Sequence, residues 1–367
     1  MIRYRPDRIL VQREAWRDRS TNEILERIPG VPVETIDDVD HVLPELNRSS
    51  DPLGSGKRCL ILMRHLGRFL KDCPGAGAEI CCNYFVVNLA SNCHMECTYC
   101  FLQSYLNNPA MLVFTNIEEM LAEVGGRVSR EPGRLFRIGT GELADSLALD
   151  DLTHYSIRLV PFFGSLPNTI LELKTKSDQV DNLEGLLHRG HTVVSWSINS
   201  KRITREEELK TATFEKRLEA ARRCQEWGYR VGFHIDPMIH YEGWEADYRE
   251  AITEVFRVVN PVGVAWVSIG SLRFPPGLRE IVRARFPRSI IPYGEMVPGN
   301  HGKIRYFRPI RSEMYSKMRA WIYEEAPEVF VFLCMENRAA WEDSFQTVPR
   351  GTADLSDQMD SLVRISD

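Results

Sequence analysis

The chain has 367 residues, of which 46 are Lys or Arg and 51 are Asp or Glu, so its net charge at neutral pH is −5. Hydrophobic residues make up 43% and charged residues 26% of the sequence, a composition that excludes a disordered or fibrous chain. The apolar runs are too short to span a bilayer, and the first residues lack the apolar core of a secretory signal. We therefore predict a cytoplasmic protein with no membrane partner. Nine cysteines, an odd number, favour reduced thiols over a disulfide framework.

The first 80 residues are charge-rich. Apolar residues at helical spacing over Ala15–Arg27 and Cys59–Lys71 predict two helices there. We therefore expect residues 1–80 to form an N-terminal helical extension.

From Tyr84 onward, short apolar runs alternate with amphipathic segments of helical length. Six strands that are each followed by a helix indicate βαβ units with a parallel sheet in an α/β fold, over residues 81–290. The predicted strands are Tyr84–Leu89, Leu135–Thr140, Ile170–Thr175, Thr192–Ile198, Arg230–Ile235 and Val262–Ile269. The predicted helices are Ile117–Val128, Ala148–Leu159, Gln179–His188, Thr213–Trp227, Trp244–Val259 and Gly277–Phe286.

Two topologies fit this alternation. Right-handed crossovers close the strands into a partial (β/α)6 barrel of the TIM type, whereas a doubly wound sheet uses the same elements in another order. Periodicity does not separate the two. A barrel, however, gathers its chemistry at the carboxyl ends of successive strands.

The last segment, residues 291–367, forms a C-terminal module in this interpretation. It contains a predicted helix, Glu313–Glu325, and a predicted strand, Val329–Cys334. The polar, acidic stretch from Glu342 to Asp367 is expected to be a loosely held tail.

Three cysteines with the spacing C-x3-C-x2-C follow the first strand of the barrel: Cys93, Cys97 and Cys100. Thiolates on one short loop converge on a single centre and select zinc or an iron–sulfur cluster. Three ligands suit a [4Fe–4S] cluster with one iron left open. The alternatives are a zinc site completed by His94, or three structural cysteines.

Polar groups also stand at the ends of later strands. Strand two ends in Gly139-Thr-Gly141-Glu142, where glycines allow close approach of a ligand and a carboxylate pairs with an ammonium group. The next two strands end near Lys176 and Ser197, which are alternatively a solvated lysine and a buried serine. Asp236, before a proline, is a further candidate at the end of strand five, while nearby His234 fits a core histidine better.

The cysteine spacing, with aromatic Tyr99 before the last cysteine, resembles the radical S-adenosylmethionine (SAM) superfamily. The resemblance implies a barrel of the radical SAM type, a [4Fe–4S] cluster on Cys93, Cys97 and Cys100, and SAM bound to the open iron. It further implies that SAM is cleaved to a 5′-deoxyadenosyl radical, which abstracts hydrogen from a substrate, and that an external donor such as flavodoxin or ferredoxin supplies the electron. Gly139, Gly141 and Glu142 resemble the Gly-Gly-Glu motif that holds the SAM amino group.

Several stretches are similar to the spore photoproduct lyase family, which splits a thymine lesion in ultraviolet-damaged DNA. They are Asn83–Leu89, the cysteine loop with Leu102–Pro109, Thr175-Lys176, Ser197–Asn199 and Glu242–Glu245. By this resemblance Lys176 and Ser197 contact SAM. Asp236 is predicted to join the SAM site because of its position at the end of strand five.

The sequence departs from that family at two positions. Glu142 stands at or next to the place of the cysteine that returns a hydrogen atom to the product radical. Tyr99 keeps the first tyrosine of the radical relay, but Phe101 replaces the second and has no O–H to give up. Cys81 or Cys82 is an alternative donor, although ordinary burial explains both. We therefore expect retained radical chemistry, with Glu142 and Tyr99 as the catalytic candidates and with the lyase reaction itself open.

Charge is unevenly distributed along the chain. Residues 273–319 hold eleven basic and three acidic residues, a net +8, whereas residues 321–367 hold three basic and ten acidic ones, a net −7. Bases and aromatics alternate over Asn300–Arg308, a pattern that fits a hairpin wedged into duplex DNA. The predicted contacts are Lys303, Arg305, Tyr306 and Arg308; the alternative is a solvated basic face.

We predict an enzyme that modifies or repairs a DNA base by hydrogen abstraction. Two rivals stay open at this point. One is a radical SAM enzyme acting on a peptide or small metabolite, and the other is a non-catalytic iron–sulfur or zinc protein that binds nucleic acid.

Overall fold

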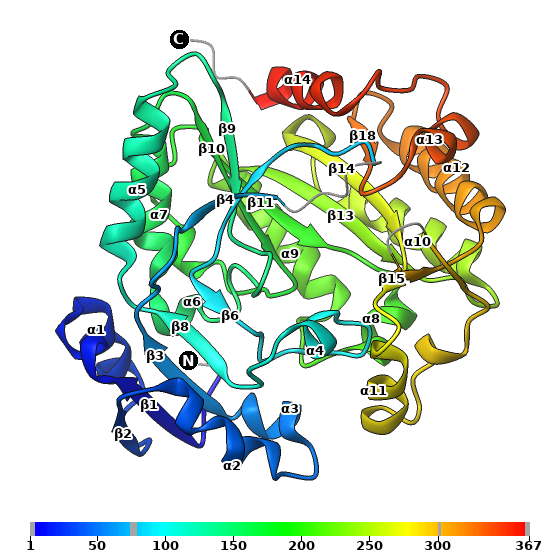
Figure 1. The fold of residues 1–367 in the computed structure, drawn as a ribbon. Helices are drawn as coiled ribbons and strands as arrows, with labels where there is room; N and C mark the ends of the chain where they lie inside the picture. Colours follow the sequence, from blue (N-terminus) through cyan, green and yellow to red (C-terminus); the bar gives the residue numbers. More distant parts are fainter. Residues whose placement is uncertain (1–3, 74–78, 300–301, 364–367) are drawn as a thin grey trace.

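The computed structural model describes residues 4–73, 79–299 and 302–363, and its main feature is an eight-stranded sheet (Figure 1). The strands lie in the order β18-β14-β13-β11-β10-β9-β5-β4. All neighbours are parallel except β4 and β5. The bounds are β4 (Leu70–Asp72), β5 (Phe85–Val87), β9 (Phe136–Gly139), β10 (Thr169–Thr175), β11 (Thr192–Ser197), β13 (Arg230–Met238), β14 (Val264–Ser271) and β18 (Val331–Leu333).

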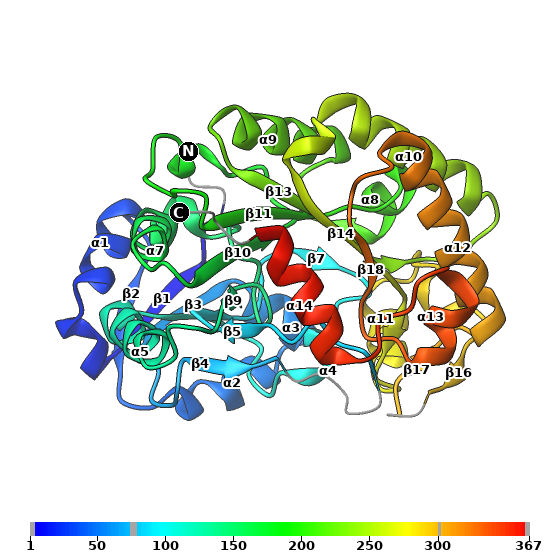
Figure 2. The same ribbon diagram turned by 90° about the horizontal axis from the view of Figure 1, so that it is seen from above.

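The order of the strands decides between the two expected topologies. From β5 to β18 the strands follow one another in chain order without reversal, whereas a doubly wound sheet reverses at a switch point. The helices surround the outer side of the curved sheet in Figures 1 and 2, which confirms the partial barrel. These helices are α5 (Ile117–Ser129), α7 (Tyr155–Gly164), α9 (Phe214–Glu226), α10 (Trp244–Val258), α11 (Leu278–Arg285) and α12 (Arg308–Glu325).

Residues on the two faces of the barrel strands differ in chemistry. In β11 every residue is buried, and Val194 and Trp196 alternate with Ser195 and Ser197. Ser195 Oγ donates to Glu172 of β10, so the serine side of the strand faces other polar strand residues. Because successive strand side chains point to opposite faces, the apolar residues are left to pack against the helices.

The N-terminal segment is not the helical extension that the sequence predicts. Cys59–Met63 is a buried strand, β3, in a second, five-stranded sheet of order β2-β1-β3-β8-β6. A short continuous apolar run fits a buried parallel strand as well as a helix, and the sheet partners decide. Two of these strands follow residue 80, so the sheet also crosses the expected boundary. The bounds are β1 (Arg8–Gln12), β2 (Val33–Ile36), β6 (Ala90–Ser91) and β8 (Met111–Phe114).

Two of the helices predicted from the sequence also differ from those in the structure. The segment Ala148–Leu159 contains His154 in the left-handed region, with φ 53°, so the chain forms α6 and then α7 instead of one helix. The segment Gln179–His188 holds only a 3-10 turn at Asp181–Leu183, because Gly185 has φ 73° and interrupts any helix. The remaining short helices are α1 (Arg19–Arg27), α2 (Leu43–Asn47), α3 (Pro52–Gly56), α4 (Leu102–Tyr105), α6 (Asp150–Thr153) and α8 (Lys201–Glu207).

The described part of the acidic tail is folded. It forms α13 (Arg338–Ser344) and α14 (Thr352–Val363), and α14 buries Leu355, Met359 and Val363. The Asp360 carboxylate of α14 pairs with Arg137 of β9 at 2.7 Å. The expectation of a loosely held tail is therefore wrong for these residues, since apolar residues at helical spacing anchor them.

None of the helices in the described part of the chain is long and apolar enough to cross a membrane.

Candidate cofactor and nucleic-acid sites

The cysteine loop lies between β5 and α4, at the carboxyl end of the first barrel strand. Part of the loop forms β7 (Glu96–Cys97), which pairs antiparallel with β12 (Glu208–Leu209). The Thr98 N–H donates to the Glu207 carbonyl at 2.8 Å, and the Tyr99 hydroxyl donates to the Glu208 carboxylate. The loop is therefore fixed on one side by a segment that follows β11.

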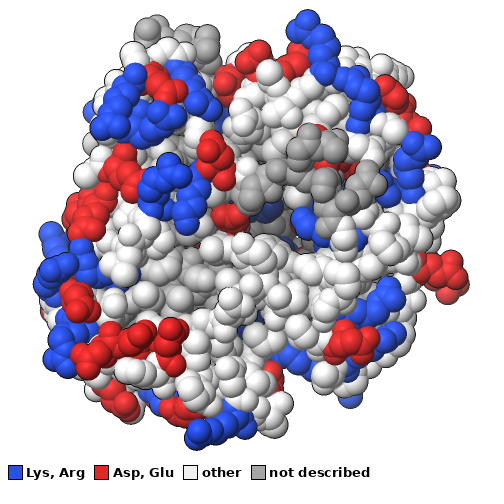
Figure 3. All heavy atoms as spheres, in the orientation of Figure 1, with Lys and Arg blue, Asp and Glu red and all other residues white. Residues whose placement is uncertain are grey.

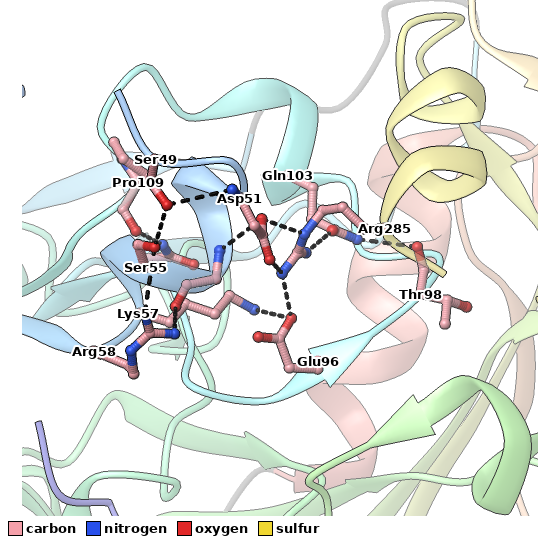
Figure 4. Close-up of polar contacts among 12 residues, drawn as sticks. Ser49, Asp51, Ser55, Lys57, Arg58, Glu96, Thr98, Gln103, Pro109 and Arg285 are labelled. Atoms are coloured by element: carbon pink, nitrogen blue, oxygen red, sulfur yellow. Dashed lines mark hydrogen bonds and ion pairs between the residues drawn. The ribbon is translucent and has the colours of Figure 1, made fainter. Parts of the chain in front are cut away.

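An ionic cluster, buried except at Asp51, fixes the other side of the loop, as Figure 4 shows. Arg285 of α11 pairs with Glu96 at 3.0 Å and with Asp51 at 2.9 Å, and it donates to the Gln103 amide oxygen. Lys57 Nζ lies 3.3 Å from the same Glu96 carboxylate. We call Asp51, Lys57, Glu96, Gln103 and Arg285 the loop clamp. Its members come from the N-terminal segment, the cysteine loop and the last barrel helix.

The thiols of the loop share one environment. Burial raises the pKa of Cys93 to about 12 and the pKa of Cys97 further, and the negative charges of neighbouring thiols add to both effects. The Lys176 ammonium opposes the rise at Cys97. Within the described ranges, no group of three Cys, His, Asp or Glu side chains is positioned so that it could hold a metal ion. Three cysteines on one buried loop beside a cation nevertheless fit a soft-metal cluster, because a cationic metal replaces the protons that burial favours.

Gly139, Gly141 and Glu142 lie beside this loop. Glu142 Oε2 accepts from the amide of Asn88, the first residue after β5, at 3.1 Å. A Cβ atom on Gly139 would come within 2.7 Å of the Tyr84 ring, and one on Gly141 within 3.2 Å of Lys174. The crowded backbone explains the glycines, and Glu142 is placed next to the segment that carries the cysteines.

Lys176 is also brought to the loop. Its Nζ lies 5.7 Å from the centre of the Tyr99 ring, and its backbone N–H donates to Asp145 at 2.7 Å. The other Asp145 oxygen accepts from Thr175 Oγ1 at 2.6 Å. Asp145 therefore ties the segment after β9 to the end of β10. Ser197 is buried at the end of β11, opposite His234 of β13.

The sequence predicts that the Asp236 carboxylate contacts SAM, but in the structure this carboxylate already pairs with another side chain. Both of its oxygens accept from Arg273, each at 3.0 Å. Its pKa is lowered: burial acts to raise it, and the Arg273 guanidinium outweighs burial. A bidentate pair of this kind argues against a SAM contact and makes Asp236 the residue that orients Arg273.

The interpretation of His234 as a core histidine agrees with the structure. The ring lies 2.7 Å from Glu172 through Nε2 and 2.7 Å from Ser268 through Nδ1. Burial lowers the pKa of His234, while the Glu172 carboxylate acts to raise it. Together with Ser195, these residues form a polar network across β10, β11, β13 and β14.

Tyr99 and Phe101 occupy opposite environments. Tyr99 is buried and held by Glu208, whereas Phe101 is 40% exposed and packs edge-on against Tyr105. Burial raises the pKa of Tyr99. Tyr99 is therefore part of the loop site, and the Phe101 ring lies at the surface.

The predicted hairpin exists, but its side chains are not all available for DNA. Strands β16 (Val297–Pro298) and β17 (Ile304–Arg305) pair antiparallel, and β17 also pairs with β15 (Arg273–Phe274). Tyr306 is 3% exposed, and its hydroxyl accepts from the His240 N–H at 3.0 Å, so it does not stack on a base. The exposed aromatic beside it is Phe307, at 59%.

The basic residues of this segment divide in the same way. Arg305 pairs with the fully buried Glu336, so it is a structural residue and not an available phosphate contact. Arg308 has a half-exposed side chain that lies 3.4 Å from Asp343. Lys303 is partly buried, and burial lowers its pKa. Arg308 is thus the most accessible of the three predicted basic contacts. On the face shown in Figure 3, basic and acidic residues alternate around the rim of a broad uncharged area.

Comparison with known proteins identifies the family of this fold and site. The family model of spore photoproduct lyase matches residues 70–332. This chain belongs to the spore photoproduct lyase family. It is 28% identical over 208 residues to spore photoproduct lyase of Geobacillus sp. (strain Y412MC61), covering 56% of this chain and 61% of that protein. It is 31% identical over 166 residues to the enzyme of Bacillus subtilis (strain 168), covering 45% of this chain and 48% of that one. The chain thus matches about three fifths or less of the length of these two relatives.

Solved spore photoproduct lyase structures share the fold. One variant structure has a TM-score of 0.81 at 23% identity, over 90% of this chain and 99% of the other. Another, described as holding AdoMet (SAM) and a dinucleoside spore photoproduct, has a TM-score of 0.79 at 23% identity, over 89% and 98%.

The region matched by the spore photoproduct lyase model includes every residue predicted to bind the cluster or SAM, as well as the hairpin. It leaves out the first strands of the second sheet and α14. Sequence reasoning missed Asp145, Glu172, Glu208 and Arg285, which hold the predicted residues in place. Their partners are far away in sequence, and no local motif marks them.

Proposed function

We propose that this protein is a radical SAM enzyme that binds a [4Fe–4S] cluster through Cys93, Cys97 and Cys100. One observation carries the proposal: the cysteine loop, Glu142 and Lys176 come from the ends of three neighbouring strands and meet at one edge of the barrel. This is where a barrel places its chemistry.

The chain's own residues have distinct tasks in this proposal. When bound, the cluster and SAM supply a 5′-deoxyadenosyl radical that takes a hydrogen atom from the substrate. Glu142 pairs with the SAM ammonium group, while Gly139 and Gly141 allow its close approach. Lys176 and Ser197 hold the SAM carboxylate, and the burial of Tyr99 beside them excludes water from the loop.

The proposed substrate is a damaged thymine base in DNA. Family membership and the description of the relatives' structures with a dinucleoside spore photoproduct support this class of substrate. Glu142 has no thiol hydrogen to return, and Phe101 has no hydroxyl, so the final hydrogen donor differs from that of the family. We therefore propose a lyase or a related base modification, with flavodoxin or ferredoxin as the electron donor.

The decisive experiment is anaerobic reconstitution followed by dithionite and SAM. We expect 5′-deoxyadenosine to form, and to increase when ultraviolet-irradiated DNA is added. The Cys97→Ala variant is expected to lose both cluster and turnover, whereas Cys224→Ala, at a buried cysteine of α9, retains them. If no 5′-deoxyadenosine forms under either condition, the proposed radical SAM activity is wrong. If SAM is cleaved but irradiated DNA does not increase the cleavage, the proposed DNA substrate is wrong.

A further inference from the structure

A second group of cysteines lies where the two edges of the main sheet approach each other. Cys73 follows β4, Cys81 and Cys82 precede β5, and Cys334 follows β18. Ile80 and Glu336 form an antiparallel bridge between these edges, with Ile80 N–H donating to the Glu336 carbonyl at 2.9 Å. We call Cys73, Cys81, Cys82 and Cys334 the thiol quartet.

Backbone pairing brings the quartet together. Cys81 directly follows Ile80, and Cys334 lies two residues before Glu336, so the bridge brings these two segments close together. The Cys73 N–H donates to the Tyr84 carbonyl at 3.0 Å, which extends the β4–β5 pairing toward Cys82. The thiols influence one another: Cys73 and Cys82 lower the pKa of Cys81, whereas Cys81 and burial raise the pKa values of Cys73, Cys82 and Cys334.

The surroundings of the quartet suit a negatively charged centre. Arg273 Nη2 lies 3.8 Å from Cys334 Sγ, and Arg137 donates to the Cys82 carbonyl. Four thiolates around one divalent ion carry a net charge of −2, and these two guanidinium groups, which also pair with Asp236 and Asp360, lie beside it. All four cysteines are only partly buried, whereas Cys59 and Cys224 are buried elsewhere in the core.

We propose that the thiol quartet binds a second soft-metal centre, separate from the cysteine loop, with all four thiolates as ligands. A zinc ion and an iron–sulfur cluster use the same tetrathiolate chemistry. Among the described residues neither the quartet nor the loop is arranged so that it could hold a metal ion, so this proposal requires the thiols of both to move when they bind. A centre at this position links β4 and β5 to β18 and so closes the barrel at its seam.

The experiment uses the full chain with the loop ligands removed, as Cys93→Ala, Cys97→Ala and Cys100→Ala together. One sample is loaded with zinc and another with iron and sulfide, and the metal bound per chain is measured after desalting. We expect about one zinc ion or one iron–sulfur cluster to remain. Adding Cys73→Ser and Cys334→Ser is expected to lower retention at least tenfold, while adding Cys59→Ser and Cys224→Ser leaves it unchanged.

A second measurement does not depend on the folding of variants. The wild-type chain is alkylated with and without loaded metal, and each cysteine is located by mass spectrometry. The quartet is expected to be protected only in the loaded protein. The proposal is overturned if the loop variant retains neither zinc nor cluster, if the Cys73→Ser and Cys334→Ser changes leave retention intact, or if the quartet is alkylated equally in both states.

Discussion

At the scale of single residues, buried charges in the barrel are held by specific partners. Glu172 accepts from both His234 and Ser195, and Asp236 accepts twice from Arg273. Burial acts to raise the pKa of Glu172, but His234 and Ser195 lower it to about 2. A carboxylate in this situation stabilises the fold only while it is ionised.

The Glu172→Gln variant tests this network. Because the folded pKa lies below the usual value of about 4.3, the contribution of Glu172 is complete above pH ~5 and is lost as the pH falls toward 2. We expect the variant to lose about 2 kcal/mol in free energy of unfolding at pH 7, and the difference from wild type to shrink toward pH 3. Urea unfolding at several pH values measures this difference in free energy of unfolding, and Glu184→Gln, at an exposed residue, is the control. A difference that does not change with pH would contradict the assignment.

Arg305 and Arg308 are expected to respond differently to substitution. Arg305→Ala removes one cation from buried Glu336, which keeps Arg311, and is expected to lower stability by about 1–3 kcal/mol. Arg308→Ala removes a half-exposed charge and is expected to leave stability within about 0.5 kcal/mol while weakening DNA binding at low salt. Thermal unfolding compares the stability of the two variants, and a DNA-binding titration compares their affinity for DNA. DNA affinity that Arg308→Ala leaves unchanged would count against the hairpin contact.

At the scale of elements, α11 acts on the cysteine loop through one side chain. Arg285 pairs with Glu96, the neighbour of Cys97, and with Asp51. Gln103 donates to the Cys97 carbonyl at 3.2 Å, so the clamp restrains the backbone that carries the thiols. The helix thus contributes to the site without supplying a ligand.

Arg285→Ala is expected to reduce the iron retained per chain several-fold, because Glu96 and Asp51 lose the cation that holds the loop. Arg283→Ala is the matched control, since Arg283 is exposed on the same helix, pairs with Glu280 at 2.8 Å and lies over the Tyr293 ring. Iron content and the electron paramagnetic resonance spectrum of the reduced cluster show directly how well the loop holds the cluster. Equal iron retention and identical spectra in both variants would refute this role.

Elements with strong periodicity could be predicted from the sequence, and contacts between distant segments could not. The strand ends at Gly139–Glu142 and Lys176 were placed correctly because the glycines and the alternation are local signals. Cys59–Met63 was assigned to a helix because a short apolar run fits both structures until its neighbours are known. The burial of Tyr306 could not be predicted from the sequence, because it depends on the hydrogen bond from His240 and on the packing around the ring.

At the scale of the whole molecule, the C-terminal helix α14 completes the core. Leu355, Met359 and Val363 are all buried, and Leu355 is fully so. Leu355→Ala is expected to lower the free energy of unfolding by about 2–5 kcal/mol, whereas exposed Asp357→Ala changes it by less than about 0.5 kcal/mol. Chemical denaturation compares the two variants. A Leu355→Ala variant as stable as wild type would mean that α14 packs weakly.

The loop clamp also has a consequence for biosynthesis. Its members are made in the order Asp51, Lys57, Glu96, Gln103 and, much later, Arg285. On the ribosome the cysteines emerge long before the arginine that secures them, and Glu208, which holds Tyr99, also follows the loop by a wide interval. Arg285 is made 185 residues after Cys100 in the 367-residue chain, so the nascent chain presents its thiol loop without the complete clamp for about half of its translation. We therefore expect the proposed cluster to be inserted late in folding, and the thiols of a chain arrested before Arg285 to be open to oxidation.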